Sequence, residues 1–200
     1  MKNIVFSGLF LLASINLFAQ SEENQTSKEF QDTINKEYAN KDESPLMEED
    51  LKSFKGLDFY PINEKYIVTA KFVRTANEKN FKMKMTGTRT PEYVKYGELH
   101  FQLDGKDFKL NVYQNIELMK KEGYADYLFL PFSDLTCGKE SYIGGRYIDM
   151  RIPNADAAII DFNKAYNPYC AYNHKYSCPI VPLDNNLKIE ILAGVKKFHD

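Results

Sequence analysis

The sequence predicts a mainly β protein, an antiparallel β-sandwich or barrel with one or two N-terminal helices. Beyond residue 66 apolar and polar residues alternate as in half-buried strands, and no helical period follows about residue 125. Aromatic residues are abundant, with 14 tyrosines and 14 phenylalanines, and aromatic side chains form favourable cross-strand pairs. Short strands joined by turns fit both architectures, so sandwich and barrel stay open as alternatives.

Residues 1–19 have the layout of a secretion signal. A basic start at Lys2 precedes an apolar run from Ile4 to Ala19, which ends on a small residue. This run is shorter than the ~20 uninterrupted apolar residues that span a bilayer, and no second long apolar segment follows it. We therefore expect cleavage after Ala19 and an exported mature chain, periplasmic or secreted, without a transmembrane segment.

The charge of the chain is nearly balanced, since 26 basic and 28 acidic residues give a formal net charge of −2. Proteins adapted to nucleic acid or anionic lipid normally carry a basic excess or stripe, so no nucleic-acid partner is expected. The chain shows no phosphate-binding glycine loop, no HExxH helix and no serine elbow, and no cofactor is expected. The expected partner is an unknown small molecule or a component of the cell envelope.

Helical patterns are confined to the N-terminal part. Residues 20–44 form a polar, partly helical segment in which apolar residues recur every four positions: Phe30, Ile34 and Tyr38. A second helix is predicted to begin at Pro45, because Ser44 can cap it and its first turn is acidic. Residues 45–200 are interpreted as a single β-rich domain.

Asp104-Gly105 predicts a two-residue hairpin turn. This turn pairs apolar with apolar and polar with polar residues: Phe101 with Phe108, Leu99 with Leu110, His100 with Lys109, and Gln102 with Asp107. A shift of the register by one residue would destroy the agreement. Other strands are expected at residues 66–72, 127–132, 157–162 and 187–193, with a tight turn at Gly144-Gly145 that pairs Tyr142 with Tyr147.

Between Pro131 and Pro182 many polar residues lie among turns, in four recognisable runs: Pro131 to Asp134, Gly145 to Tyr147, Asp161 to Pro168, and Cys170 to Tyr172 with Cys178-Pro179. The chain from about residue 50 to 198 resembles the domain of unknown function 1684 family of uncharacterised bacterial and archaeal proteins. It departs from the family pattern at Cys137, where Asn is expected, and at Asp184 and Val195, where Glu is expected. The resemblance implies a domain, but no activity, substrate or catalytic residue.

The charged residues of these runs suggest a ligand-binding site. Asp134, Arg146 and Asp161 could converge, because an arginine between two carboxylates binds one of them bidentately. Four further polar residues would complete a site for an anionic or hydroxylated ligand: Asn163, Tyr166, Asn167 and Tyr172. The alternative, which we prefer, is a buried structural ion pair with Asp and Asn side chains that cap turns.

Cys170, His174 and Cys178 are spaced four apart, as metal ligands on one helical face would be. A structural zinc site needs four ligands, however, and the prolines that flank this segment argue against a continuous helix. An exported protein is exposed to oxidising conditions, so we expect a Cys170–Cys178 disulfide, which would stabilise the fold by about 2.5 kcal/mol, and no metal site. Cys137 is then a third thiol, interpreted as a small buried apolar residue and not as a nucleophile.

Two functions remain open. The first is a non-catalytic binding or structural module of the cell envelope. The second is a small envelope hydrolase that uses Asp134, Arg146, Asp161 and the neighbouring Asn and Tyr residues. The hydrolase requires these side chains to meet in one open pocket. A redox role for the cysteine pair is a third possibility, although its spacing is not that of a Cys-x-x-Cys motif.

Overall fold

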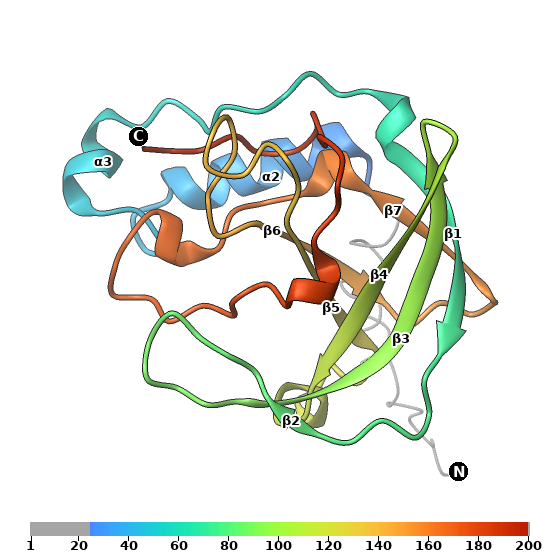
Figure 1. Cartoon of the computed structure of the whole chain (residues 1–200). Helices are drawn as coiled ribbons and strands as arrows, with labels where there is room; N and C mark the ends of the chain where they lie inside the picture. Colours follow the sequence, from blue (N-terminus) through green and yellow to red (C-terminus); the bar gives the residue numbers. More distant parts are fainter. Residues whose placement is uncertain (1–24, 200) are drawn as a thin grey trace, which may run out of the picture.

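Seven antiparallel strands form one sheet that curls into a half-barrel (Figure 1). Their order is β6-β5-β4-β3-β1-β7, and β2 pairs with β3 beside this path. The structure, a computed structural model, describes residues 25–199, so the predicted signal segment lies outside the described residues. The strands are β1 (Ile67–Arg74), β2 (Phe81–Lys82), β3 (Glu92–Leu103), β4 (Lys106–Asn115), β5 (Tyr127–Phe132), β6 (Arg146–Arg151) and β7 (Ala157–Asp161). The mainly β, antiparallel expectation is confirmed, with a curled half-barrel as the architecture.

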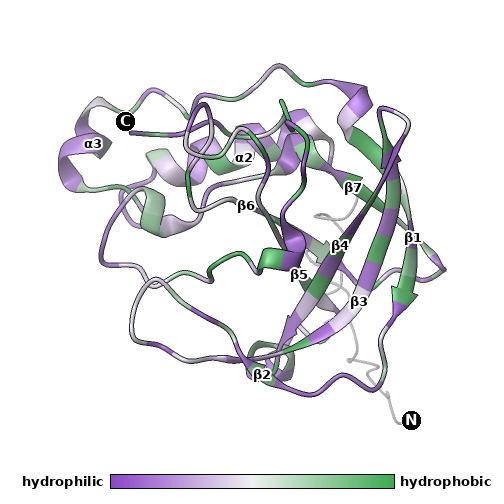
Figure 2. Cartoon of the chain, viewed as in Figure 1, coloured by the Kyte–Doolittle hydropathy of each residue, from purple (hydrophilic) through white to green (hydrophobic). Residues whose placement is uncertain are grey.

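The β3–β4 hairpin is the longest pairing of the sheet and has the predicted register. Asp104 and Gly105 both have positive φ, 52° and 70°, which matches the right-handed twist of the flanking strands. All four predicted cross-strand pairs are present, including Leu99 with Leu110. Figure 2 shows the resulting alternation of hydrophobic and hydrophilic residues along β3 and β4.

Within residues 25–199, two α-helices precede the sheet, α2 (Ser27–Ala39) and α3 (Glu48–Ser53). The helix α2 begins with a reciprocal capping box between Thr26 and Glu29, and it buries Ile34 and Tyr38 as its apolar stripe predicts. The helix α3 begins three residues later than predicted, because the hydroxyl of Ser44 accepts from the Leu46 amide in the preceding turn. Short 3₁₀ helices occupy Glu64–Tyr66, Leu118–Lys120, Phe162–Lys164, Tyr169–Ala171 and Leu183–Asn185. Among residues 25–199, no helix is long and apolar enough to cross a bilayer.

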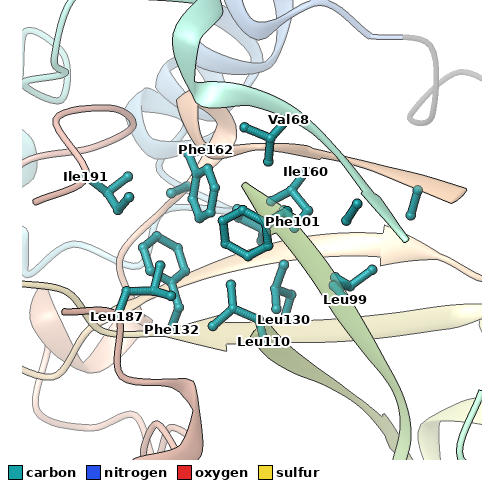
Figure 3. Close-up of a cluster of buried hydrophobic side chains, with 14 of the residues drawn as sticks. Val68, Leu99, Phe101, Leu110, Leu130, Phe132, Ile160, Phe162, Leu187 and Ile191 are labelled. Carbon is teal, nitrogen blue, oxygen red and sulfur yellow. The ribbon is translucent and has the colours of Figure 1, made fainter. Parts of the chain in front are cut away.

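The main core lies on the inner face of the curled sheet and is completed by the C-terminal segment. Leu187 and Ile191 pack with Phe132 and Phe162 in this core (Figure 3). The strand expected at residues 187–193 is not formed. This segment is irregular because its bonds to the chain after β5 are few: the Leu187 amide donates to Ser133 O at 2.8 Å, and the Leu135 amide to Ile189 O at 3.0 Å.

A second cluster covers the opposite face of β3 to β6. It contains Met83, Tyr93, Tyr113, Phe129 and Tyr147. The expected pairing of Tyr142 with Tyr147 is wrong, because β6 pairs with β5 and not with the residues before its own turn. Tyr147 lies opposite Pro131 in β5 and forms a bridge with Tyr166. Gly145, with φ +85°, still closes a tight turn onto Tyr142 O.

Asn185 holds β4 and β5 together where the two strands diverge. Their register contains only the pair Tyr113–Phe129, and Pro131 has no amide proton to give. The side chain of Asn185 donates to Asn111 O at 2.8 Å and to Pro131 O at 2.6 Å, and it accepts from the Asn111 amide at 2.9 Å. This fully buried amide replaces part of a strand ladder.

We expect Asn185→Ala to lower the free energy of unfolding by about 3 kcal/mol, because it leaves buried backbone groups without partners. Asn185→Asp keeps the shape and the acceptor but loses both donated bonds, so a large loss is expected here too. Urea denaturation followed by circular dichroism measures both. Asn186→Ala, at the exposed neighbouring side chain, is the matched control, and an equal loss there would contradict the assignment.

Candidate functional site

Asp134 and Arg146 form an ion pair inside the protein. Arg146 begins β6 and Asp134 lies just after β5, so the two strands bring them together. Arg146 Nη2 is 2.6 Å from Asp134 Oδ2, and both side chains have 0% exposure. Asp134 Oδ1 accepts from the amide of Thr136 at 2.7 Å and from its hydroxyl at 2.6 Å. Both oxygen atoms of the Asp134 carboxylate therefore accept hydrogen bonds from groups of the same chain.

The guanidinium of Arg146 also binds the C-terminal segment. Nη2 donates to Ile191 O at 2.9 Å, and Nη1 donates to Ala193 O and, at 3.4 Å, to Val195 O. The ring of Phe132 lies 5.3 Å from the guanidinium carbon. One cation therefore joins β6, the chain after β5 and the segment that completes the core.

The polar network around Asp134 extends to Thr136 and Ser141, which the sequence did not single out, and to Cys137. The hydroxyls of Thr136 and Ser141 are 2.7 Å apart and buried. Cys137 Sγ accepts from the Asp134 amide at 3.4 Å and from Ser141 Oγ at 3.7 Å. These contacts of Cys137 include neither a base nor a cation, and activation of a thiol requires one of them.

Asp161 and Asn163 lie at a different place, the junction of β7 with the N-terminal helix. Asp161 Oδ2 accepts from Ser27 Oγ at 2.7 Å, and Asp161 Oδ1 accepts from the Asn163 amide at 3.0 Å. The buried side chain of Asn163 pairs with the backbone of Asn63 through bonds of 3.0 and 3.1 Å. Gln31 of α2 donates to Asn163 O at 3.1 Å. The group fastens α2 and the loop before β1 to the sheet.

The last three predicted residues are separate again. The side-chain amide of Asn167 donates to Lys196 O at 2.9 Å. Tyr172 is buried, with its ring 5.1 Å from the rings of Tyr38 and of Phe198. Tyr166 points elsewhere: its hydroxyl donates to Asp149 Oδ1 at 2.7 Å. The seven candidate residues therefore do not meet in one pocket.

A second tyrosine shares the hydrogen-bond acceptor of Tyr166. The hydroxyl of Tyr127 donates to the same oxygen, Asp149 Oδ1, at 2.6 Å. Asp149 is exposed, whereas both tyrosines are partly buried. Alternation along the residues that follow the predicted Gly144-Gly145 turn could have placed Asp149 on the face opposite Ile148, but nothing in the sequence pairs it with tyrosines distant in the chain.

A shallow open depression of about 720 Å³ lies elsewhere on the protein. Its lining includes Tyr60, Lys65, Glu140 and Leu192, and it contains none of the seven candidate residues. Tyr60 links the depression to the ion pair, because its ring lies 5.9 Å from the guanidinium carbon of Arg146. Burial raises the pKa of the Tyr60 hydroxyl, so this phenol stays protonated at neutral pH.

Cys170 and Cys178 lie together as free thiols. The amide of Cys170 donates to Cys178 Sγ at 3.2 Å, and the hydroxyl of Tyr142 lies 3.9 Å from Cys170 Sγ. The hydrogen bond from Cys178, together with those from Tyr142 and Thr86, lowers the pKa of the Cys170 thiol to about 6. The bond to Cys170, followed by burial, raises the pKa of Cys178. His174 is exposed, and residues 25–199 contain no group of three or more His, Cys, Asp or Glu side chains arranged to hold a metal ion.

The fold and the site define a class: a β-rich half-barrel domain in which two charged motif residues, Asp134 and Arg146, form a buried ion pair. Residues 52–196 match the family described as protein of unknown function DUF1684, and the chain belongs to this family. The solution NMR structure of an uncharacterized protein from gene locus rrnAC0354 of Haloarcula marismortui is similar, with 29% sequence identity and a TM-score of 0.67. The similarity covers 90% of this chain and 94% of that one. No curated protein matches the chain.

We expect Arg146→Met and Asp134→Asn each to lower the free energy of unfolding by about 3–5 kcal/mol, because each leaves an unpaired or unsatisfied buried group. The double variant Arg146→Met/Asp134→Leu should recover part of this loss, since no charge is then left buried. Chemical denaturation measures all three.

The exposed pair Lys120–Glu117 provides the control, and Glu117→Gln should leave stability almost unchanged. Losses below about 1 kcal/mol for both single variants, the range of surface pairs, would contradict a structural role for the buried pair.

Alkylation of the reduced protein tests the thiol pair. The rate at Cys170 should rise with pH through a midpoint of about 6, because the thiolate forms as the pH rises through the lowered pKa. Iodoacetamide labelling with peptide-resolved mass spectrometry separates Cys170 from Cys137. Cys178→Ala removes the S–H donor and should move the midpoint up towards the ~8.5 of a free cysteine. A midpoint near ~8.5 in the wild-type protein would contradict the hydrogen bond between Cys178 and Cys170 that lowers the pKa of Cys170.

Proposed function

We propose that this protein is an exported, non-catalytic binding or structural module of the cell envelope. The observation that supports this role is the Asp134–Arg146 pair with its partners. Each of their polar contacts described above goes to another group of the same chain, and both side chains are fully buried. The charged residues of two family motifs thus hold strands and the C-terminal segment in place.

The alternative, an envelope hydrolase, is less well supported by this geometry. General acid–base catalysis needs a nucleophile, a base and the substrate within hydrogen-bonding reach of one another. Asp134 and Arg146 are enclosed, whereas Asp161 binds Ser27 and Asn163 at the helix junction. Residues that stabilise separate parts of a fold do not form one catalytic site.

We further propose that Cys170 and Cys178 form a disulfide after export. The contact between the Cys170 amide and Cys178 Sγ brings the two residues together, and the low pKa of Cys170 provides a thiolate. This thiolate attacks the disulfide of an oxidising partner in the exported compartment, and Cys178 then displaces that partner from the mixed disulfide. The partner leaves as a dithiol, which carries away the two electrons. The bond would fasten the loop that ends at Pro179. The carbonyl of Pro179 accepts from the hydroxyl of Tyr147, in the outer aromatic cluster. A closed loop over this cluster suits a protein that works outside the cytoplasm.

The exported protein should begin at Gln20 or Ser21 and should be lighter by two hydrogens than its reduced form. Intact-mass spectrometry of material recovered after expression in a host with an export pathway measures both. Thiol titration under denaturing conditions should detect one thiol before reduction and three after it, because the chain has three cysteines.

A matched Cys178→Ser variant should show two thiols before and after reduction. A full-length mass in the cell extract alone would contradict export, and three thiols before reduction would contradict the disulfide. The two results are independent of each other.

A further inference from the structure

Three separate parts of the chain line the shallow depression beside the buried ion pair. They are residues 60–66 before β1, Glu140 in the loop before β6, and Leu192 in the C-terminal segment. The volume of about 720 Å³ is within the range of ligand-binding sites, and the depression is open to solvent. Small molecules are normally buried over most of their surface. A shallow, open site of this size therefore suits a segment of another protein better.

The buried guanidinium of Arg146 fixes one side of the depression. Leu192 lies between Ile191 and Ala193, and the carbonyl groups of these two neighbours both accept from Arg146. The backbone on each side of Leu192 is therefore tied to the interior, although its side chain is 39% exposed. The position of this side chain is set by the ion-pair network.

The other two sides are held in the same way. The Asn63 amide donates to Asn163 Oδ1 at 3.0 Å, and Asn163 Nδ2 donates to Asn63 O at 3.1 Å. The Glu140 amide donates at 3.1 Å to the carbonyl of Thr136, whose side chain is bonded to the carboxylate of the ion pair. Buried polar residues of the family motifs thus fix all three parts of the chain that line the depression.

The lining presents apolar surface to solvent. Ile62 is 42% exposed, and Leu192 brings a second exposed aliphatic side chain from a distant part of the sequence. The rings of Tyr60 and Tyr66 also belong to the lining and are largely buried. Single exposed apolar residues are ordinary, but two of them in one depression with rigid sides offer a contact surface to an apolar group.

The charged residues of the lining are Glu64, Lys65 and Glu140. Lys65 is neutralised, because its Nζ is 2.8 Å from Asp104 Oδ2. In the part of the chain that the structure describes, the carboxylates of Glu64 and Glu140 form no ion pair or hydrogen bond. After burial, the charge of Glu140 contributes to the raised pKa of Tyr60, which places this carboxylate close to the depression.

Three other lysines belong to the same segments of the chain. Lys196 Nζ is 5.2 Å from the centre of the Tyr60 ring and 3.5 Å from Asp58 Oδ2, which offsets its charge. Lys139 and Lys197 do not contribute to the lining. Negative charge therefore predominates among the residues that a ligand in the depression would meet.

We propose that this depression binds a basic, partly apolar peptide segment of another protein. Aliphatic side chains of the peptide pack against Ile62 and Leu192, and its lysine or arginine side chains face Glu64 and Glu140. The inference rests on the proposed binding role and names the chemistry of the partner. Because the buried motif residues fix the sides of the depression in advance, little of the binding energy is lost in ordering them.

An NMR titration of the purified protein with acetylated and amidated tetrapeptides tests the inference. The peptide Lys-Leu-Lys-Leu should give saturable shifts at the amides of residues 62–66 and 192. The peptide Glu-Leu-Glu-Leu has the same apolar side chains and the opposite charge, and it should bind about tenfold or more weakly. Lys-Ser-Lys-Ser keeps the charge and should bind a few-fold more weakly, since it lacks the apolar contacts. Butylamine, which supplies a cation without a peptide, should bind more weakly than Lys-Leu-Lys-Leu.

Variants locate the site. Glu64→Gln/Glu140→Gln should weaken binding of Lys-Leu-Lys-Leu by about fivefold or more, since it removes both charges. Glu48→Gln/Glu49→Gln is the matched control, because it makes the same change of charge at two exposed residues of α3, across the molecule from residues 64–66 (Figure 1). The control should bind the peptide like the wild-type protein. Thermal melting shows whether each variant folds.

Equal binding of the basic and acidic peptides, or undiminished binding by a folded Glu64→Gln/Glu140→Gln variant, would overturn the inference. Equal affinity for butylamine and the basic peptide would overturn the assignment to a peptide. If acidic or neutral peptides shift these amides and basic ones do not, the inference fails while the binding role survives. If no probe shifts any amide, the inference also fails, and the envelope role is then judged by the mass and thiol measurements alone.

Discussion

Much of the structure depends on a single buried cation. Arg146 carries its charge to a place with no solvent exposure, and Asp134 neutralises it there. Removing two charges from water costs several kcal/mol per ion, and the cost is offset only when geometry and further hydrogen bonds are good. Three carbonyl groups of residues 191–195 provide those further bonds. The C-terminal segment therefore keeps its position through a contact between charge and backbone, without belonging to the sheet.

This arrangement explains why polar residues in the family motifs are not by themselves evidence of catalysis. The runs that contain Asp134, Arg146, Asp161 and Asn163 place hydrogen-bonding groups where irregular backbone would otherwise be buried without partners. Asn185 does the same between β4 and β5. A half-barrel with few strand residues after β7 has many such backbone groups, and fixed polar side chains satisfy them.

Local sequence was enough to predict a large part of the fold. The Asp104-Gly105 turn set the register of β3 and β4, since two positive φ values and matched faces admit one solution. The irregular path of residues 187–193 could not be predicted, because an apolar run looks the same whether its backbone pairs with a strand or with the side chain of Arg146. Pairing of Tyr147 with Pro131 instead of Tyr142 likewise depends on the order of strands, which local pattern does not contain.

The same limit applies to the candidate site. The sequence grouped Asp134, Arg146 and Asp161 as charged residues that could converge, but it did not indicate which carboxylate Arg146 would bind; in the structure it binds Asp134. Asp161 also carries a negative charge, but it faces α2. Its partner Ser27 lies 134 positions away in the sequence, so the local pattern could not predict this contact. The convergence of Tyr127 and Tyr166 on Asp149 requires the curl of the sheet, which no single segment encodes.

The place of Leu187 and Ile191 in the core has a consequence for the order of events during synthesis. The strands from β1 to β7 are all made before these residues, yet Phe132 and Phe162 can meet Leu187 and Ile191 only after residues 187–191 have left the ribosome. Until residues 191–195 follow, the guanidinium of Arg146 also lacks its carbonyl partners. We therefore expect the core to close late, after the last strand has been made. For the proposed export, late closure of the core would favour transport of the chain before it folds.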